Sequence, residues 1–381
     1  MTEERVPVEA FPPGEFLKEE LEARGWTQTD LAEILGRPVQ LVNEIIANKR
    51  VITPETAKGL ADAFGTSGHY WLNLQSAYQL RQLAERDSAV ARRARLYGLA
   101  PLKEMIRRRW IEHSSSLEVL EKQVCDFFCI ESLDEEPSFL RYAARKATSY
   151  ADLSPAQRAW LFRAFHLAQT LNVRPFTDLL LEQCLERLHL LRADIEEVRH
   201  IPRVLAESGI RFLVIEPLQQ TRIDGVCFWL DEKSPVIALS LRYDRIDSFW
   251  FSLMHEMGHL INRDGLKNDG QVDTDLVGDR ALPTEEKPQF ERQADEFAAN
   301  FLVPQAEIAS FIARIRPLYS VSRIVGFARR IRVHVGIVVG QLQRRGEITY
   351  AHHRGMLEKV KHILTSSALT DGWGHLAPMV V

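Results

Sequence analysis

Two histidines and a glutamate lie close together in the sequence HEMGH at residues 255–259. Apolar residues flank this H-E-x-x-H motif on both sides, which indicates a helix. Histidines four residues apart project from one helical face about one turn apart, so both imidazoles can bind one zinc ion. Glu256 between them can accept a proton from a zinc-bound water. The alternative is a helix whose histidines form only local hydrogen bonds.

A catalytic zinc site needs a third protein ligand, and residues 290–301 offer candidates. Apolar residues recur there at helical spacing, and Pro304 follows as a helix stop. Glu291 and Asp295 are four residues apart and share one stripe of this helix. We predict that Glu291 binds the metal and that Asp295 accepts the free N–H of a ligating histidine. Glu296 is the rival ligand, and the alternative is an ordinary solvated acidic helix.

These residue types predict hydrolysis of a peptide bond without a covalent intermediate. Zinc lowers the pKa of its water and polarises the substrate carbonyl, while Glu256 acts as general base and then passes the proton to the leaving amine. A donor for the developing oxyanion is also expected. The sequence leaves four candidates open: Tyr243, His334, Tyr350 and His352.

The segments around the motif predict how it is positioned. Residues 210–215, 225–230 and 236–241 have strand patterns, and the turn at 231–235 predicts that the last two form a hairpin. Asp244 is expected to cap the zinc-binding helix. Residues 262–287 are polar and contain several Gly and Asp residues, which predicts a mobile loop near the site. Helices are expected again at 320–330 and 335–345.

Residues 11–80 carry a separate signal. The pattern predicts helices at 14–21, 27–35, 39–47 and 55–64, with Thr27 and Thr53 as N-caps. Gly36 separates the second helix from the third, and Pro38 fits the first turn of the third. Two short helices joined by a tight glycine turn form a helix-turn-helix, whose second helix enters the DNA major groove.

Six polar side chains in this segment are candidates for DNA contacts. Gln40 and Asn43 could reach base edges, because amides pair with adenine through two hydrogen bonds. Phosphate contacts are expected from Gln28, Arg37, Lys49 and Arg50. Acidic residues outnumber basic ones before Leu80, so affinity must come from a local patch, doubled in a homodimer. The alternative is a helical bundle that contacts only proteins.

The N-terminal segment resembles the Xre-type helix-turn-helix of HigA-like antitoxins. The resemblance lies in PGEFLKEEL at 13–21, TQTDLA at 27–32, ITPETA at 52–57 and YWLNLQ at 70–75. It departs at Pro38 and Val39, where such proteins often have small polar residues. The resemblance implies binding to an operator, and the departure concerns the operator sequence rather than the fold.

Residues 201–350 resemble the ImmA/IrrE metallopeptidases. The shared features are H-E-x-x-H, the block ERQADEFA at 291–298, LVP at 302–304 and VVGQL at 338–342. The resemblance implies His255, His259 and Glu291 as zinc ligands and Glu256 as base. It also implies cleavage of a helix-turn-helix repressor or antitoxin, which relieves transcriptional repression after stress or DNA damage.

The leading hypothesis is therefore a DNA-binding transcriptional regulator with a zinc-dependent endopeptidase domain. It would cleave a repressor- or antitoxin-like protein in a stress, toxin–antitoxin or phage-defence pathway. A first alternative is a non-catalytic antitoxin or repressor whose zinc domain senses a ligand or binds a toxin. A second is a peptidase whose N-terminal module binds protein rather than DNA.

Bulk properties set wider limits. The 381 residues predict two or three domains, and a net charge of −4 neither requires nor excludes nucleic acid. No apolar stretch could span a membrane and no secretory leader opens the chain, so we expect a cytoplasmic protein without membrane contact. Four scattered cysteines suit a reducing compartment. Cys125 and Cys129 could be a redox pair or buried small apolar groups.

Together these patterns predict an α+β protein that is mainly α. We expect a helix-turn-helix bundle at 11–80 and a helical linker or scaffold at 81–200. A zincin-like domain with a small antiparallel-type sheet and the H-E-x-x-H helix is expected at 201–350. A C-terminal tail would follow at 351–381.

Overall fold

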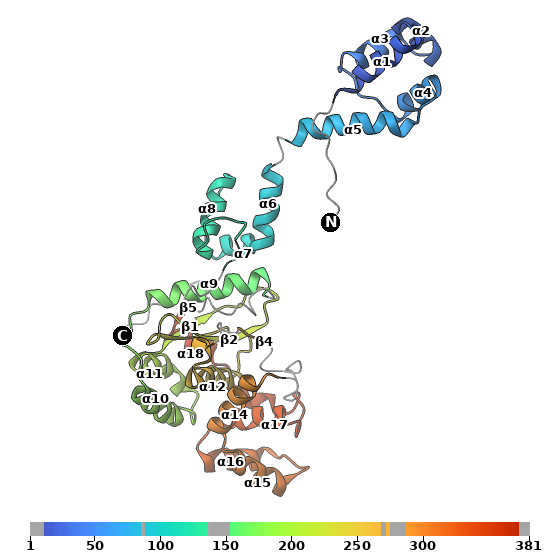
Figure 1. Ribbon diagram of the computed structural model, residues 1–381. Coiled ribbons are helices and arrows are strands. Elements are labelled where there is room, and N and C mark those ends of the chain that lie inside the picture. The colour runs from blue at the N-terminus through green and yellow to red at the C-terminus, as the bar shows by residue number, and fades with distance from the viewer. Residues whose placement is uncertain are drawn as a thin grey trace. The chain divides into compact units, whose positions relative to one another are not determined.

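The computed structural model describes residues 11–84, 88–135, 137, 153–267, 272–274 and 287–372. The chain forms two compact units, Met1–Arg95 and Leu96–Val381, which are coloured from blue to red in Figure 1. Each unit has hydrophobic core residues of its own. Within the described ranges, no helix combines the length and apolarity needed to cross a membrane. The predicted α+β class, mainly α, is confirmed.

The N-terminal unit contains α1 (Pro13–Arg24), α2 (Gln28–Leu35), α3 (Val39–Ile46), α4 (Pro54–Phe64) and α5 (Gly68–Ala84). The predicted helix-turn-helix is confirmed as α2 and α3, and Gly36 ends α2 in the left-handed conformation with φ of 61°. Thr27 and Asp30 form a capping box at the start of α2. Pro38 is the N-cap of α3 rather than part of its first turn.

The apolar face of helix α3 packs into the core of the N-terminal unit. Val42, Ile45 and Ile46 are buried in the core of this unit together with Trp71 of α5. Gly14 of α1 allows the close approach, because a Cβ there would lie 2.6 Å from the carbonyl oxygen of Ile45. The opposite face of α3 is left for solvent or a ligand.

The middle of the chain contains α6 (Ser88–Leu99), α7 (Leu102–Arg107), α8 (Leu117–Phe128), α9 (Pro155–Thr170), α10 (Asp178–Leu191) and α11 (Ile201–Glu207). Ser154 caps α9 with a capping box to Gln157. The apolar residues of α9, such as Trp160, share a core with the sheet residues Leu213 and Phe228. From residue 96 onward, the segment expected to be a linker is therefore part of the C-terminal unit. The boundary expected after residue 80 falls inside α5.

The sheet consists of β1 (Arg211–Ile215), β2 (Ile223–Trp229), β3 (Pro235–Leu239), β4 (Val272–Thr274) and β5 (Leu369–Asp371), in the order β4-β2-β3-β1-β5. The predicted hairpin is confirmed, since β2 pairs antiparallel with β3. However, β1 runs parallel to both β3 and β5, so the sheet is mixed rather than antiparallel. The strand patterns predict the pairing across a short turn, but not which strands far apart in the chain become neighbours.

The end of the chain belongs to this sheet. Leu369 pairs with Leu213, and the Asp371 carboxylate accepts hydrogen bonds from Trp110 Nε1 at 3.1 Å and from the Arg163 guanidinium. Residues 351–372 therefore contribute to the fold, and the boundary expected at 350 does not separate a tail. These side chains also connect β5 to the helices of the middle segment.

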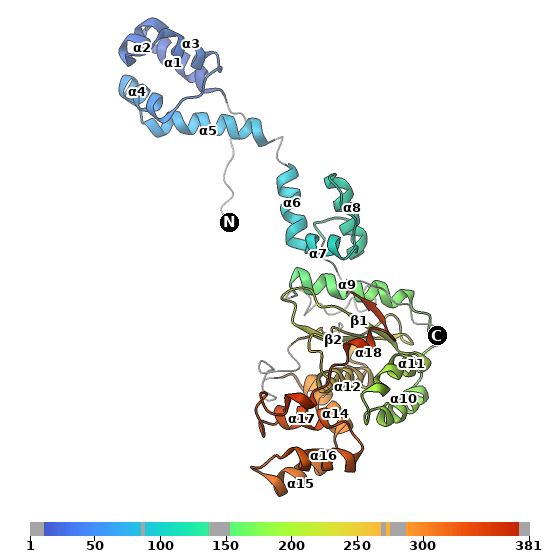
Figure 2. The same cartoon turned by 180° about the vertical axis from the view of Figure 1, so that it is seen from behind.

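On the other side of the sheet lie α12 (Ile246–Asn262), α14 (Gln289–Leu302) and α17 (Val335–Arg344), with α9 opposite them (Figures 1 and 2). The remaining helices are α13 (Asp264–Lys267), α15 (Gln305–Ile315), α16 (Val321–Ile331) and α18 (Lys361–Leu364). Asp244 does not cap α12: its carboxylate accepts the backbone N–H groups of Val360 and Lys361 at 3.0 and 2.7 Å. The loop expected at 262–287 lies largely outside the described residues.

Candidate metal centre and recognition helix

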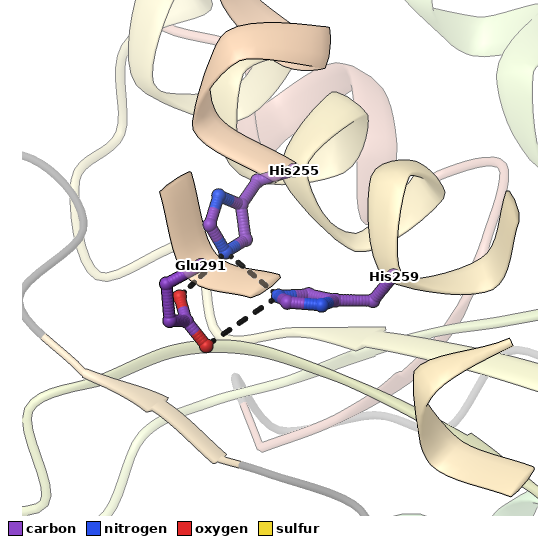
Figure 3. A group of neighbouring side chains, drawn as sticks. All are labelled: His255, His259 and Glu291. Carbon is purple, nitrogen blue, oxygen red and sulfur yellow. Dashed lines mark hydrogen bonds and ion pairs between the residues drawn. The ribbon is translucent and has the colours of Figure 1, made fainter. Parts of the chain in front are cut away.

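His255 and His259 of α12 and Glu291 of α14 meet in one buried group (Figure 3). The two Nε2 atoms are 3.0 Å apart. Glu291 places Oε2 3.2 Å from His255 Nε2 and Oε1 3.6 Å from His259 Nε2. The rival Glu296 is exposed on the same helix. The helical spacing therefore turns Glu291, and not Glu296, toward the histidines.

The closeness of α12 and α14 depends on small residues. Gly258 lies between the two histidines, and a Cβ on it would be 2.9 Å from Cα of Ala294. The backbones therefore approach where neither helix carries a large side chain. This packing brings Glu291, one turn before Ala294, to the imidazoles of α12.

Each histidine is oriented by an aspartate. His255 Nδ1 donates to Asp295 Oδ1 at 2.9 Å, and His259 Nδ1 donates to Asp264 Oδ2 at 2.9 Å. With the protons held on Nδ1, both Nε2 atoms present lone pairs to each other and to the Glu291 carboxylate. Three such acceptors at this spacing repel one another unless a cation lies between them. The donor set therefore fits zinc, with two nitrogens and one carboxylate.

Asp295 joins the histidine to two cations that the sequence reasoning missed. Its Oδ2 accepts from Lys287 Nζ at 2.7 Å and from Arg344 at 3.0 Å. Burial alone would raise the pKa of the Asp295 carboxyl, but the His255 hydrogen bond and the Arg344 charge outweigh it and lower that pKa. Asp295 is therefore an anion that can hold the His255 proton on Nδ1.

Asp264 was also missed, although a signal for it exists. α12 ends at Asn262, and Arg263 turns the chain with φ of 55°. This left-handed turn brings Asp264, five residues after His259, back to the imidazole. An acidic residue just past the end of an H-E-x-x-H helix is the pattern that could have revealed it.

Glu256 lies fully buried beside this group, against β2. Its Oε1 occupies the space beside Gly225, and a Cβ on that glycine would collide with the carboxylate. The strand thus requires a residue without a side chain at this point. The Glu256 carboxylate is thereby confined between α12 and the sheet.

The four oxyanion candidates fall in different surroundings. His334 caps α17, with Nδ1 accepting the Gly336 N–H and Nε2 facing Glu358 at 2.9 Å. His352 Nδ1 is 2.7 Å from Thr349 Oγ1. Tyr243 lines a small recess together with Ser248 and Ser252 of α12. Tyr350 is half-buried, and like Tyr243 it lies near enough to Arg245 to interact with its charge.

Part of this recess lies on the face of α12 that carries His255. Ser248 and Ser252 precede His255 by seven and three residues, so they lie on the same face of α12. On the sheet side the recess is lined by Asp224, which directly precedes Gly225. Asp224 is held in a two-point ion pair by Arg242, at 3.0 and 3.1 Å. Among the four candidates, Tyr243 is the one that lines this recess.

The six predicted DNA contacts are all exposed in the N-terminal unit: Gln28, Arg37, Gln40, Asn43, Lys49 and Arg50. Glu44 of α3 engages two of them, accepting from Gln40 Nε2 at 2.9 Å and from Arg50 at 3.1 Å. Arg37 forms an ion pair with Glu55. Exposed pairs of this kind are worth little energy, so these side chains can exchange partners readily.

Comparisons with known proteins give one family match for the part that contains the candidate metal centre and another for the part that contains α3. Residues 206–345 match the peptidase family described as the IrrE N-terminal-like domain, and residues 17–71 match the family described as helix-turn-helix. Virulence-associated protein I of Dichelobacter nodosus is 42% identical over 79 residues, which are 20% of this chain and 72% of that protein. An uncharacterized HTH-type transcriptional regulator of Escherichia coli (strain K12) is 31% identical over 84 residues, 22% of this chain and 88% of that protein.

Two solved structures are similar to a short part of the chain. A HigA-family addiction module antidote protein from Coxiella burnetii has 38% identity, covering 21% of this chain and 87% of that one, with a TM-score of 0.20. The Pseudomonas aeruginosa antitoxin HigA, solved with the higBA promoter, has 32% identity at the same coverage and TM-score.

Proposed function

Because the chain belongs to the Xre-type helix-turn-helix family of DNA-binding regulators and carries an IrrE-like peptidase domain, we propose that it is a zinc-dependent endopeptidase joined to an operator-binding module. The proposed substrate is a repressor- or antitoxin-like protein. One observation carries this proposal: two imidazoles with anchored Nδ1 atoms and one carboxylate direct their lone pairs to a common point.

His255, His259 and Glu291 would hold the zinc ion. When bound, zinc supplies a Lewis acid that lowers the pKa of a water molecule and polarises the scissile carbonyl. Glu256 then accepts the proton of the attacking water on its carboxylate and passes it to the leaving amine. Gly225 keeps that carboxylate in place, and Asp295 and Asp264 keep the imidazole protons on Nδ1.

For the developing oxyanion we propose Tyr243 as donor. Its recess shares the α12 face of the metal centre. The Arg242 guanidinium lies over the Tyr243 ring, 4.8 Å from its centroid, and limits how the ring can move. His334 is already engaged through both ring nitrogens.

For the N-terminal unit we propose operator binding by α3 in the major groove. Gln40 and Asn43 would meet base edges, and Gln28, Arg37, Lys49 and Arg50 would meet phosphates. Binding as a homodimer would double this patch and match a palindromic site. The proposed place of action is the cytoplasm, where such a regulator meets its operator.

Replacing Glu256 with Gln tests the peptidase proposal. The full-length protein and E256Q are purified, zinc is measured, and both are incubated with purified helix-turn-helix repressors and antitoxins. Cleavage is followed by mass spectrometry of the fragments. Both proteins should hold about one zinc per chain. E256Q should cut roughly 10²–10⁴ times more slowly, because it has lost its general base.

Two results would contradict the mechanism. Equal cleavage by both proteins would remove Glu256 as base. Zinc in both proteins with no cleavage of any repressor or antitoxin would favour the alternative, a zinc domain that senses a ligand or binds a toxin. Glu296→Gln is the matched control, because it makes the same chemical change on an exposed side chain.

A further inference from the structure

The segment from α15 to α17 is strongly basic, although the whole chain is slightly acidic. The whole protein has a net charge of −4. Between residues 305 and 346, however, Glu307 is the sole acidic residue, and there is no lysine or aspartate. The arginines of the segment are Arg314, Arg316, Arg323, Arg329, Arg330, Arg332, Arg344 and Arg345. This concentration of one charge requires an explanation, because like charges repel.

Several of these arginines have an anionic neighbour within the unit. Arg330 pairs with Glu307 at 2.7 Å, Arg316 with Glu347 at 3.4 Å and Arg344 with Asp295 at 3.0 Å. In these three pairs a carboxylate of the same unit neutralises the arginine. The remaining charge of the segment therefore lies elsewhere, mainly on α16.

Arg323, Arg329 and Arg332 make no ion pair with any residue that the structure describes. All three are exposed. We call them the arginine face of α16. They lie away from the buried side of that helix, which Ile324, Phe327 and Ala328 form.

No large side chain covers the helix backbone between Arg323 and Arg329. Gly326 lies between Arg323 and Arg329 in the sequence, and nothing is found within 4 Å of the position that its Cβ would take. Ser322, also exposed, is on the same side. A bulky polyanion can therefore approach the helix backbone closely, with arginines on either side of the contact.

We propose that the arginine face of α16 binds the phosphate backbone of duplex DNA, as a second DNA contact separate from α3. Arginine suits phosphate because its guanidinium donates two parallel hydrogen bonds. Hydrogen bonds to phosphate oxygens carry no sequence information, so this backbone contact is independent of sequence. DNA is favoured over an acidic protein because the chain already carries an operator-binding family module, which raises the local concentration of DNA around this face.

The test compares full-length variants on non-specific duplex DNA by fluorescence anisotropy between about 50 and 200 mM salt. The first variant replaces Arg323, Arg329 and Arg332 with Ala. The matched control replaces Arg187, Arg199 and Arg203, three exposed arginines that pair with Glu207 or Glu196. Both variants lose the same charge. Thermal unfolding checks that each is folded.

We expect the α16 variant to bind DNA more weakly and to reduce the slope of log K against log salt by about 2 to 3, since each phosphate contact contributes roughly 0.9. The control should retain the wild-type slope. The same loss should appear when Lys49 and Arg50 are also replaced with Ala, which separates this face from the recognition helix. Equal slopes for the α16 variant and the control would overturn the proposal, even if the α16 variant lost an acidic protein partner.

Discussion

At the scale of single residues, the candidate metal centre depends on groups that never touch the metal position. Asp264 and Asp295 each occupy one imidazole Nδ1, and Lys287 and Arg344 hold Asp295 in turn. These contacts decide which nitrogen of each histidine is left as a ligand. The ligands alone would be free to rotate into other hydrogen bonds.

Replacing Asp264 with Ala should therefore weaken zinc binding by about 10–100-fold, because His259 loses the acceptor that fixes its tautomer. Affinity is measured by competition with a zinc chelator of known strength. Asp264 lies at the edge of the unit, with 18% of its side chain exposed, so the variant should still fold. Glu296→Ala is the control and should bind zinc like the wild type. Unchanged affinity in Asp264→Ala would show that the His259–Asp264 contact is dispensable.

At the scale of elements, the centre is a contact between two helices and a strand. Gly258 and Ala294 set the distance between α12 and α14, and Gly225 sets the space between α12 and β2. The ligands occupy both helices, so the spacing between helices is also the spacing between ligands. A change in packing should therefore affect metal binding as well as stability.

Replacing Gly258 with Val should force α12 and α14 apart. We expect a loss of about 1–3 kcal/mol of unfolding free energy, which is typical of an overpacked core. We also expect much weaker zinc binding, because Glu291 moves away from the histidines. Denaturant unfolding and zinc analysis measure the two effects. Gly326→Ala on α16 has open space around its Cβ and should be neutral or slightly stabilising. Full zinc affinity in Gly258→Val would contradict this account.

At the scale of the whole molecule, the two units have separate cores, and the candidate ligands all belong to the second. Ligand binding stabilises only the folded unit that contains the site. Zinc should therefore act on the stability of Leu96–Val381 and leave that of Met1–Arg95 unchanged.

Calorimetry of the full chain should show two transitions. Zinc at about 1,000 times its Kd would stabilise the C-terminal unit by about 4 kcal/mol, so a chelator should lower that transition alone. Glu291→Gln lacks one candidate ligand. Its C-terminal unit should therefore unfold near the temperature that the chelator gives in the wild type, and the chelator should lower that temperature much less. A single transition, or two that shift together, would mean that the units do not unfold independently.

The sequence by itself determined the features that depend on spacing within one helix. The positions of His255 and His259 on one face, the capping box of α2 and the glycine turn before α3 follow from the fixed geometry of consecutive residues. The hairpin of β2 and β3 was also predictable, because its turn lies between two adjacent strand patterns.

Only the tertiary structure decided what depends on residues far apart in the chain. In the folded chain β1 pairs with β5, and the Asp244 carboxylate accepts the backbone N–H of Val360. Arg344 donates to the Asp295 carboxylate. Helix packing turned Glu291 inward and left Glu296 in solvent. Local patterns record which face a residue occupies, but not which element that face meets. The physical reason is that two elements pack together to bury a whole apolar face of each. The free energy of that burial depends on both elements, so it cannot be read from a short stretch of sequence.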